Sequence, residues 1–218
     1  PRSADDPVGL FVAQLALEKI EENIFRGRSQ DLGFPAVFGG QVLGQALSAA
    51  SRTVPDDRSA HSLQAYFLRP GDATHPIVYT VDPIRDGGTF TTRRVVAVQH
   101  GKAIFSMSAS FQAPEEGVEH QATMPPDVPG PEGLPSDLEL ARAVAERIPE
   151  PLRTKFVCDK PIEIRQVDPV NPFAPRPREP RKYQWLRAAG ELPDDPAVHK
   201  YLLAYASDFN FLITAMLP

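Results

Sequence analysis

The spacing of apolar residues changes from a helical period to a strand period along the first half of the chain. Residues 8–24 are apolar at intervals of three and four, which predicts an amphipathic helix. Residues 25–38 are interpreted as a strand followed by a loop. From Gln41 to Ser51 the pattern predicts a second helix, and no charged residue occurs in it before Arg52. A helix without charge on any face is expected to be enclosed on several sides.

The next stretch of the chain favours β structure. Its apolar positions alternate in part, it is rich in β-branched residues, and Gly and Pro interrupt it at the expected turns. The predicted strands are residues 61–68, 76–85, 89–99 and 103–112. A shielded helix followed by a contiguous antiparallel meander predicts a helix wrapped by a curled sheet.

The second half of the chain repeats the order of strands and then a long helix. Residues 113–135 form a Pro-rich, acidic linker, and a short helix over 136–147 starts with the capping-box spacing of Ser136 and Glu139. Strands are predicted at 162–167 and 182–189, and a helix at 194–216 that begins at Asp194-Asp195-Pro196. The sequence stops where this apolar helix ends. Because such a helix needs a covering layer, we expect about 60 to 80 further residues of β structure in the natural protein.

Composition narrows the functional classes. The 218 residues are 42% hydrophobic and 23% charged, as in ordinary globular proteins, and the net charge of −5 gives no basic surface for nucleic acid or an anionic membrane. No apolar run approaches the roughly 20 residues that span a bilayer. One cysteine, Cys158, excludes an intramolecular disulfide and favours a reducing cytoplasm; it is interpreted as a packed thiol or, less readily, a nucleophile. Most of the 24 prolines fall between 114 and 180, which predicts domains at 1–113, 114–160 and 161–218.

Several kinds of chemistry lack their motif. The chain has no Gly-x-Ser-x-Gly elbow and no phosphate-binding or dinucleotide-binding glycine loop. Asp86-Gly87-Gly88 is interpreted as a hairpin turn. The histidines lack metal-ligand spacing, so neither a metal site nor a cofactor is expected. They are His61, His75, His100, His120 and His199.

Two positions on the predicted helices remain as candidates for chemistry. Gly39 and Gly40 precede the shielded helix, where exposed N–H groups could hold an anion or a carbonyl oxygen, or where glycine only permits tight packing. Asp208 falls on the apolar stripe of the last predicted helix, where its neighbours at three and four residues are apolar. A carboxylate there is costly unless it is hydrogen-bonded or functional, which indicates a general base or a water-holding group. The alternative is a surface acid at the edge of the stripe.

Five motifs in the chain resemble the type II (TesB-like) acyl-CoA thioesterases, and the resemblance extends from about residue 15 to residue 212. They are Phe38-Gly39-Gly40-Gln41-Val42-Leu43-Gly44-Gln45-Ala46, His61-Ser62-Leu63-Gln64-Ala65-Tyr66-Phe67-Leu68-Arg69-Pro70-Gly71-Asp72, Arg85-Asp86-Gly87-Gly88-Thr89-Phe90-Thr91-Thr92-Arg93, Ile104-Phe105-Ser106-Met107-Ser108-Ala109-Ser110-Phe111-Gln112 and Ala204-Tyr205-Ala206-Ser207-Asp208-Phe209-Asn210-Phe211-Leu212.

The resemblance implies an α+β tandem (double) hotdog, in which each long helix is wrapped by a curled antiparallel sheet and the second repeat is incomplete here. It further implies metal-free hydrolysis of fatty acyl-CoA, with Asp208 as the family's catalytic Asp and its Thr and Gln partners beyond residue 218. Arg85, Arg93 and Arg94 become candidates for meeting the CoA phosphates, although strand arginines are often only solvated. A homo-oligomer in the cytoplasm is also expected, because fused hotdogs usually associate.

Two other functions stay open on the same scaffold. A hotdog hydratase or dehydratase also acts on acyl thioesters, but no Asp and His pair stands at the start of a shielded helix. A non-catalytic acyl-CoA-binding protein is the other alternative. The polar partners expected after residue 218 distinguish binding alone from hydrolysis.

Overall fold

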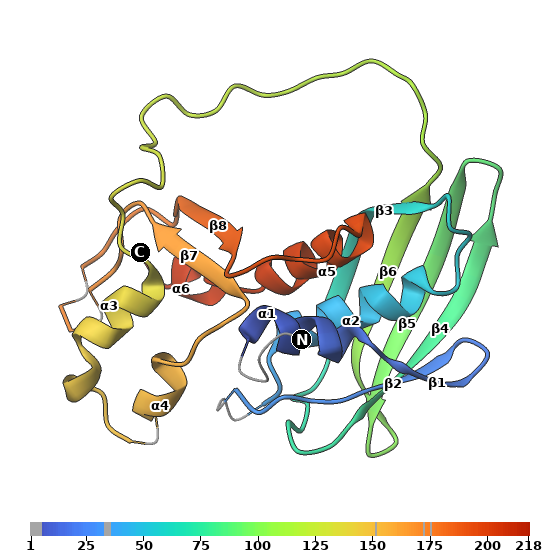
Figure 1. Ribbon diagram of the computed structural model, residues 1–218, viewed down its shortest axis with the longest axis horizontal. Helices are drawn as coiled ribbons and strands as arrows, with labels where there is room; N and C mark the ends of the chain where they lie inside the picture. The colour runs from blue at the N-terminus through green and yellow to red at the C-terminus, as the bar shows by residue number, and fades with distance from the viewer. Residues whose placement is uncertain (1–5, 33–35, 151, 172, 175) are drawn as a thin grey trace.

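The computed structural model describes residues 6–218 except 33–35, 151, 172 and 175, so part of the predicted loop at 25–38 lies outside the described residues (Figure 1). Its elements follow the chain in the order α1 (Pro7–Leu15), β1 (Glu18–Glu21), β2 (Ile24–Gly27), α2 (Gly39–Ser51), β3 (Ser59–Phe67), β4 (Ile77–Asp86), β5 (Phe90–Gln99), β6 (Lys102–Gln112), α3 (Asp137–Ala143), η1 (Ala145–Arg147), α4 (Leu152–Phe156), β7 (Ile162–Gln166), β8 (Gln184–Ala188), α5 (Pro196–Ala206) and α6 (Phe211–Ala215).

A six-stranded antiparallel sheet curves around α2 and makes the first region of the molecule (Figure 1). Its strand order is β1-β2-β4-β5-β6-β3, so β4, β5 and β6 form a meander. The prediction of one contiguous meander was wrong for β3, which crosses over and pairs with β6 at the edge of the sheet. The reason is that β3 and β4 are joined by a long connection, whereas β4–β5 and β5–β6 are joined by short turns that force neighbours to pair.

Helix α2 is enclosed, as its lack of charge predicted. Every residue from Gly40 to Ala50 is buried. Three of these residues are polar, and each has a partner: Gln41 and Gln45 both donate to the carbonyl of Arg28, and Ser48 donates to the carbonyl of Leu15. A buried amide or hydroxyl left unpaired costs about 1–3 kcal/mol, so these bonds fix the preceding segment of the chain onto the helix.

The first predicted helix is shorter than its apolar pattern indicated. Helix α1 ends at Leu15, and the residues that follow form β1 and its turn rather than two more helical turns. Strand β2 coincides with the start of the strand and loop predicted over 25–38. The strands are joined by a tight turn at Asn23, whose φ is 60°. Pairing of β2 with β4 supplies backbone hydrogen bonds that a helical segment there could not make with the sheet. Strand pairing in the folded protein therefore overrides the helical spacing of apolar residues in this segment.

The second region contains a two-stranded sheet, β7–β8, together with α3, α4 and α5. Helix α5 lies against α2 (Figure 1). The two helices run antiparallel, since Gly40 meets the carbonyl of Tyr205 while Gly44, one turn later, meets that of Tyr201. The core therefore continues from the sheet through α2 to α5, and the proposed domain boundaries at 113 and 160 remain predictions.

The long helix predicted over 194–216 is interrupted. It starts as expected, with Asp195 accepting from the N–H of Ala197 and Pro196 as the first helical residue. It stops at Ala206, and α6 begins only after Asn210, which has a φ of 68°. Because Asn210 is in the left-handed region, one continuous helix cannot run from α5 through to α6. Asp208 therefore lies in a turn and not on a helix.

The remaining predictions concern the connection between the regions. Residues 113–135 form a long arch with neither helix nor strand (Figure 1). The capping box is confirmed, since Ser136 and Glu139 exchange both of its hydrogen bonds. Helix α4 was not predicted. Among the described residues, no helix combines the length and apolar character that a membrane crossing needs.

Candidate functional site

The candidate site lies where the first turn of α2 meets the end of α5. The break after Ala206 turns Asp208 toward the start of α2, where the backbone N–H of Gly40 donates a hydrogen bond to the Asp208 carboxylate. The amino end of a helix carries a partial positive charge and favours an anion. The structure thus brings together Gly39, Gly40 and Asp208, three residues that the sequence analysis proposed separately.

Close approach requires glycine at Gly40, whereas a side chain at Gly39 would meet only the ends of the Asp208 and Phe67 side chains. A Cβ on Gly40 would come within 2.2 Å of the backbone oxygen of Tyr205, and one on Gly39 within 2.6 Å of the Asp208 carboxylate. Atoms at such distances overlap, and the Tyr205 oxygen belongs to a helix that cannot yield cheaply. The two interpretations of the Gly-Gly pair are therefore compatible at Gly40, since the same residue permits tight packing and offers its N–H to an anion.

Burial raises the pKa of Asp208 above its ordinary value, and the hydrogen bond from Gly40 opposes that rise. The desolvation is the larger of the two effects. The surroundings of Asp208 are aromatic. The ring of Phe38 packs on Tyr205 at 5.0 Å and on Phe209 at 4.6 Å between centroids. A half-buried carboxylate in such surroundings is suited to hold a water molecule and to accept a proton from it.

A groove of about 430 Å³ opens beside Asp208. It lies within the size range of small-molecule sites, and most of the side chains that line it are apolar. The ring of Phe67 on β3 reaches Gly39 and packs on Phe105 of β6, with 5.3 Å between ring centroids. The lining residues are Ala36, Val37, Gly39, Val42, Phe67, Leu68, Arg69, Pro70, Gly71, Ile104, Phe105 and Asp208. The groove is therefore suited to an apolar chain whose polar end reaches Asp208.

The three predicted arginines do not join this site. Arg93 lies near the opposite end of α2, where its side chain is only 3% exposed and donates to Thr53 and Asp86. Thirteen helical residues separate the ends of α2 by about 20 Å. Arg94 is exposed but pairs with Asp82 across β4 and β5, and Arg85 is exposed at the end of β4. The donors of Arg93 are engaged within the protein, so this arginine presents no open face to a phosphate.

Two features of the site were absent from the sequence analysis. Phe67 was noted only as part of a strand, and its place beside Asp208 depends on the crossover that puts β3 at the edge next to β6. The break between α5 and α6 was also missed. The Asn210-Phe211 step gave a weak signal for it, since Asn is among the residues that adopt positive φ most readily.

Comparison with known proteins gives matches over most of the chain. A family model described as an acyl-CoA thioesterase N-terminal domain matches residues 26–112, and one described as an acyl-CoA thioesterase matches residues 151–218. Acyl-CoA thioesterase 2 of Haemophilus influenzae is 48% identical over 213 residues, which make up 98% of this chain and 74% of the relative.

Two solved structures extend the comparison. The crystal structure of an acyl-CoA thioesterase II, TesB2, from Mycobacterium marinum is 40% identical with a TM-score of 0.72, over 95% of this chain and 71% of that one. A protein of unknown function with a hotdog fold from Alicyclobacillus acidocaldarius is 22% identical with a TM-score of 0.67, over 91% of this chain and 68% of that one. The predicted α+β hotdog architecture is thereby confirmed.

Proposed function

This chain belongs to the acyl-CoA thioesterase family, and we propose that it hydrolyses acyl-CoA thioesters in the groove beside Asp208. The products are a fatty acid and free CoA. The observation that carries the proposal is the convergence of a half-buried carboxylate, a helix amino terminus and an apolar groove at one point.

In the proposed mechanism Asp208 holds a water molecule and takes its proton, without a metal ion. The water oxygen forms a bond to the thioester carbonyl carbon, and the carbon–sulfur bond then breaks. The CoA sulfur leaves with the electron pair and receives the proton. The developing negative charge on the carbonyl oxygen needs donors aimed at it, such as backbone N–H groups at a helix amino end. The Thr and Gln partners implied by the resemblance are expected after residue 218, and no described residue takes their place.

The groove suggests where the two parts of the substrate lie. The apolar wall formed by Phe67, Leu68 and Phe105 suits the acyl chain. For the CoA phosphates Arg85 and Arg94 remain candidates because both side chains are exposed, whereas Arg93 is not carried forward.

Replacement of Asp208 by Asn in the full-length natural protein tests the proposal. The amide keeps the size of the side chain but cannot accept a proton, so we expect release of free thiol from acyl-CoAs to fall by about 10²- to 10⁴-fold. The matched control is Asp194→Asn, which alters an exposed acid just before α5 and should leave the rate unchanged. Unchanged turnover in Asp208→Asn would contradict the assignment of Asp208.

The same assay separates hydrolysis from binding alone. Acyl-CoAs of graded chain length are offered to the unmodified protein, and both bound ligand and released thiol are measured. Release of free thiol from at least one acyl-CoA supports the proposal that the protein is an enzyme. Binding without release from any of them would instead establish the non-catalytic alternative.

We also propose that the protein is a homo-oligomer and works in the cytoplasm. The first proposal is supported by β3, an edge strand on which Leu63, Tyr66 and Phe67 are exposed. The single cysteine suits a reducing compartment. Light scattering of the purified protein and fractionation of its source cells test the two proposals.

A further inference from the structure

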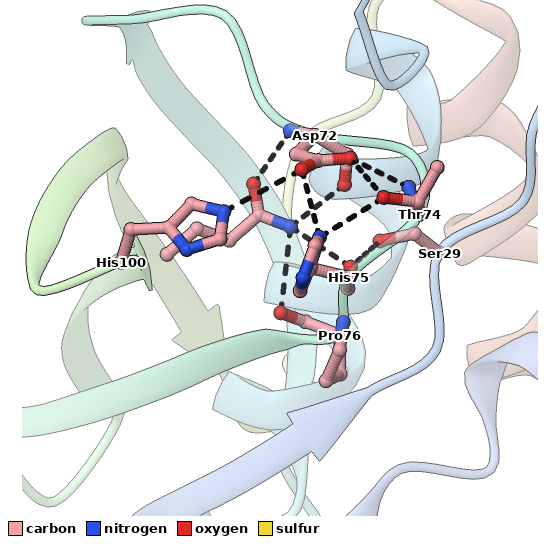
Figure 2. Close-up of polar contacts among 7 residues, drawn as sticks. Ser29, Asp72, Thr74, His75, Pro76 and His100 are labelled. Carbon is pink, nitrogen blue, oxygen red and sulfur yellow. Dashed lines mark hydrogen bonds and ion pairs between the residues drawn. The ribbon is translucent and has the colours of Figure 1, made fainter.

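We propose that Asp72, His75 and His100 form a binding site for a divalent transition-metal ion, of which zinc is the representative. These residues lie on two turns at one end of the sheet, and their side chains converge (Figure 2). The site is separate from Asp208, and the proposal does not depend on thioester hydrolysis.

The ligand atoms are spaced closely enough for one ion to reach all three. Asp72 Oδ2 is 2.7 Å from His75 Nδ1 and 3.5 Å from His100 Nε2, and all three atoms lie within 4.8 Å of one another. Ligands about 2.0–2.1 Å from a tetrahedral zinc ion are separated by about 3.3 Å. Small rotations of exposed side chains bring the present geometry to that spacing, and such rotations are fast.

Hydrogen bonds to the backbone fix the loop that carries Asp72 and His75. The buried amide of Gln99 donates to the carbonyl oxygens of Asp72 and His75 and accepts from the N–H of Asp72. Ser29 donates to the same carbonyl of His75. The backbone of two ligands is thus fixed before an ion arrives, so little conformational entropy remains to be lost on binding.

The third ligand is placed by a tight turn. His100 and Gly101 have φ values of 49° and 71°, and Gln99 pairs with Lys102. A two-residue hairpin with positive φ at both positions sets the direction of its first side chain. The imidazole rings of His75 and His100 meet at 4.7 Å between centroids, at 70° to each other.

The orientation of the Asp72 carboxylate is set by Thr74. The hydroxyl and the backbone N–H of Thr74 both donate hydrogen bonds to this carboxylate. Both of these bonds go to Oδ1, which leaves Oδ2 directed at the two imidazoles. Oδ2 is therefore the oxygen that would bind the ion.

The donor set selects the class of ion. Two imidazole nitrogens and one carboxylate oxygen suit zinc, nickel, copper or iron, whereas calcium and magnesium prefer oxygen ligands throughout. The side chains of Asp72, His75 and His100 are 38%, 56% and 58% exposed, so water molecules can complete the coordination. An ion here would join the β3–β4 connection to the β5–β6 turn. Gly71, adjacent to Asp72, lines the groove beside Asp208.

The histidine spacing did not lead us to expect this cluster. His75 and His100 are 25 positions apart, and two antiparallel strands bring their turns to the same end of the sheet. Spacing rules detect ligands within one local motif, whereas these three are assembled by strand pairing.

Calorimetric titration of zinc into the untagged, EDTA-treated full-length protein tests the proposal. We expect one ion per chain, and at least tenfold weaker binding in His75→Ala and in His100→Ala. His120→Ala, in the exposed connection between the regions, is the matched control and should bind zinc as the unaltered protein does. At zinc concentrations about 100 times the dissociation constant, Tm should rise by about 5–10 °C, and EDTA should reverse the rise.

The outcomes are decisive in both directions. Each variant is first compared with the parent by circular dichroism and Tm in EDTA, so that loss of fold is not mistaken for loss of a ligand. Failure of the parent to bind zinc more tightly than millimolar would overturn the proposal. Equal affinity in the parent and in both cluster variants would also overturn it, because the ion would then bind elsewhere.

Discussion

Helices α2 and α5 have similar apolar content but different surroundings. Helix α2 has the curved six-stranded sheet on one side and α5 on another, and all residues from Gly40 to Ala50 are buried. Helix α5 buries Tyr201, Leu202 and Tyr205, yet Leu203 is 66% exposed. This difference shows that α5 is held in the described structure chiefly by its contact with α2.

That difference explains how the candidate site is built. Asp208 follows α5 in the second region, but the N–H that binds its carboxylate belongs to α2 in the first. Neither region therefore forms the site alone, and whatever moves α5 relative to α2 also moves Asp208.

The largest expected effect is a difference in stability between the same Leu→Ala substitution made on α2 and on α5. Leu47 on α2 is 2% exposed and Leu203 on α5 is 66% exposed. We expect Leu47→Ala to lower the free energy of unfolding by about 2–5 kcal/mol, because it leaves a cavity. Leu203→Ala should change it by less than about 0.5 kcal/mol. Urea denaturation of both variants measures the difference, and equal losses would show that Leu203 is covered in the natural protein.

The contact between the helices is tested by a second pair of substitutions. A Cβ on Gly40 would lie 2.2 Å from the Tyr205 oxygen, whereas one on Gly44 would lie 3.3 Å from the Tyr201 oxygen. Gly40→Ala should therefore destabilise the protein by about 1–3 kcal/mol and lower thioester hydrolysis by displacing Asp208. Gly44→Ala should be nearly neutral, since the gain in helix propensity of about 1 kcal/mol offsets a slight crowding. The same loss in both variants would contradict the close approach at Gly40.

The smallest effect is a pH dependence carried by Asp208. Because its pKa is raised in the folded protein, the folded state keeps this proton to a higher pH than the unfolded chain does. The free energy of unfolding should therefore fall as pH rises from the ordinary pKa of Asp through the raised value. Asp208→Asn should lack this fall, and urea denaturation from pH 3.5 to 7 on both proteins measures it. Parallel pH profiles would show that the carboxylate has no raised pKa.

Local patterns predicted much of the fold correctly. Strands β2 to β6, the enclosure of α2 and the capping box at Ser136 follow from alternation, absence of charge and cap chemistry. Those features depend on contacts within a few residues or on burial of a single element. The pattern failed at β1, where a helical period continued into residues that pair with β2, and in the position of β3, whose partner β6 is distant in the chain.

The candidate site was predicted only in part, for the same reason. Gly39, Gly40 and Asp208 were each selected from their sequence surroundings, and the structure brings them together. The expectation that Arg93 faces a phosphate did not foresee that its guanidinium would bond Thr53 and Asp86 inside the protein. Solvent exposure of a strand residue depends on which face the sheet turns inward, and an isolated strand does not reveal that.

The sequence by itself determined the family, the hotdog elements and the residue types available for chemistry. Only the tertiary structure decided that the turn after α5 places Asp208 against the start of α2, and that Asp72 and His75 share one end of the sheet with His100. The physical reason is that helix packing and strand pairing join residues far apart in the chain. The free energy of these contacts exceeds the local preferences that a sequence pattern records.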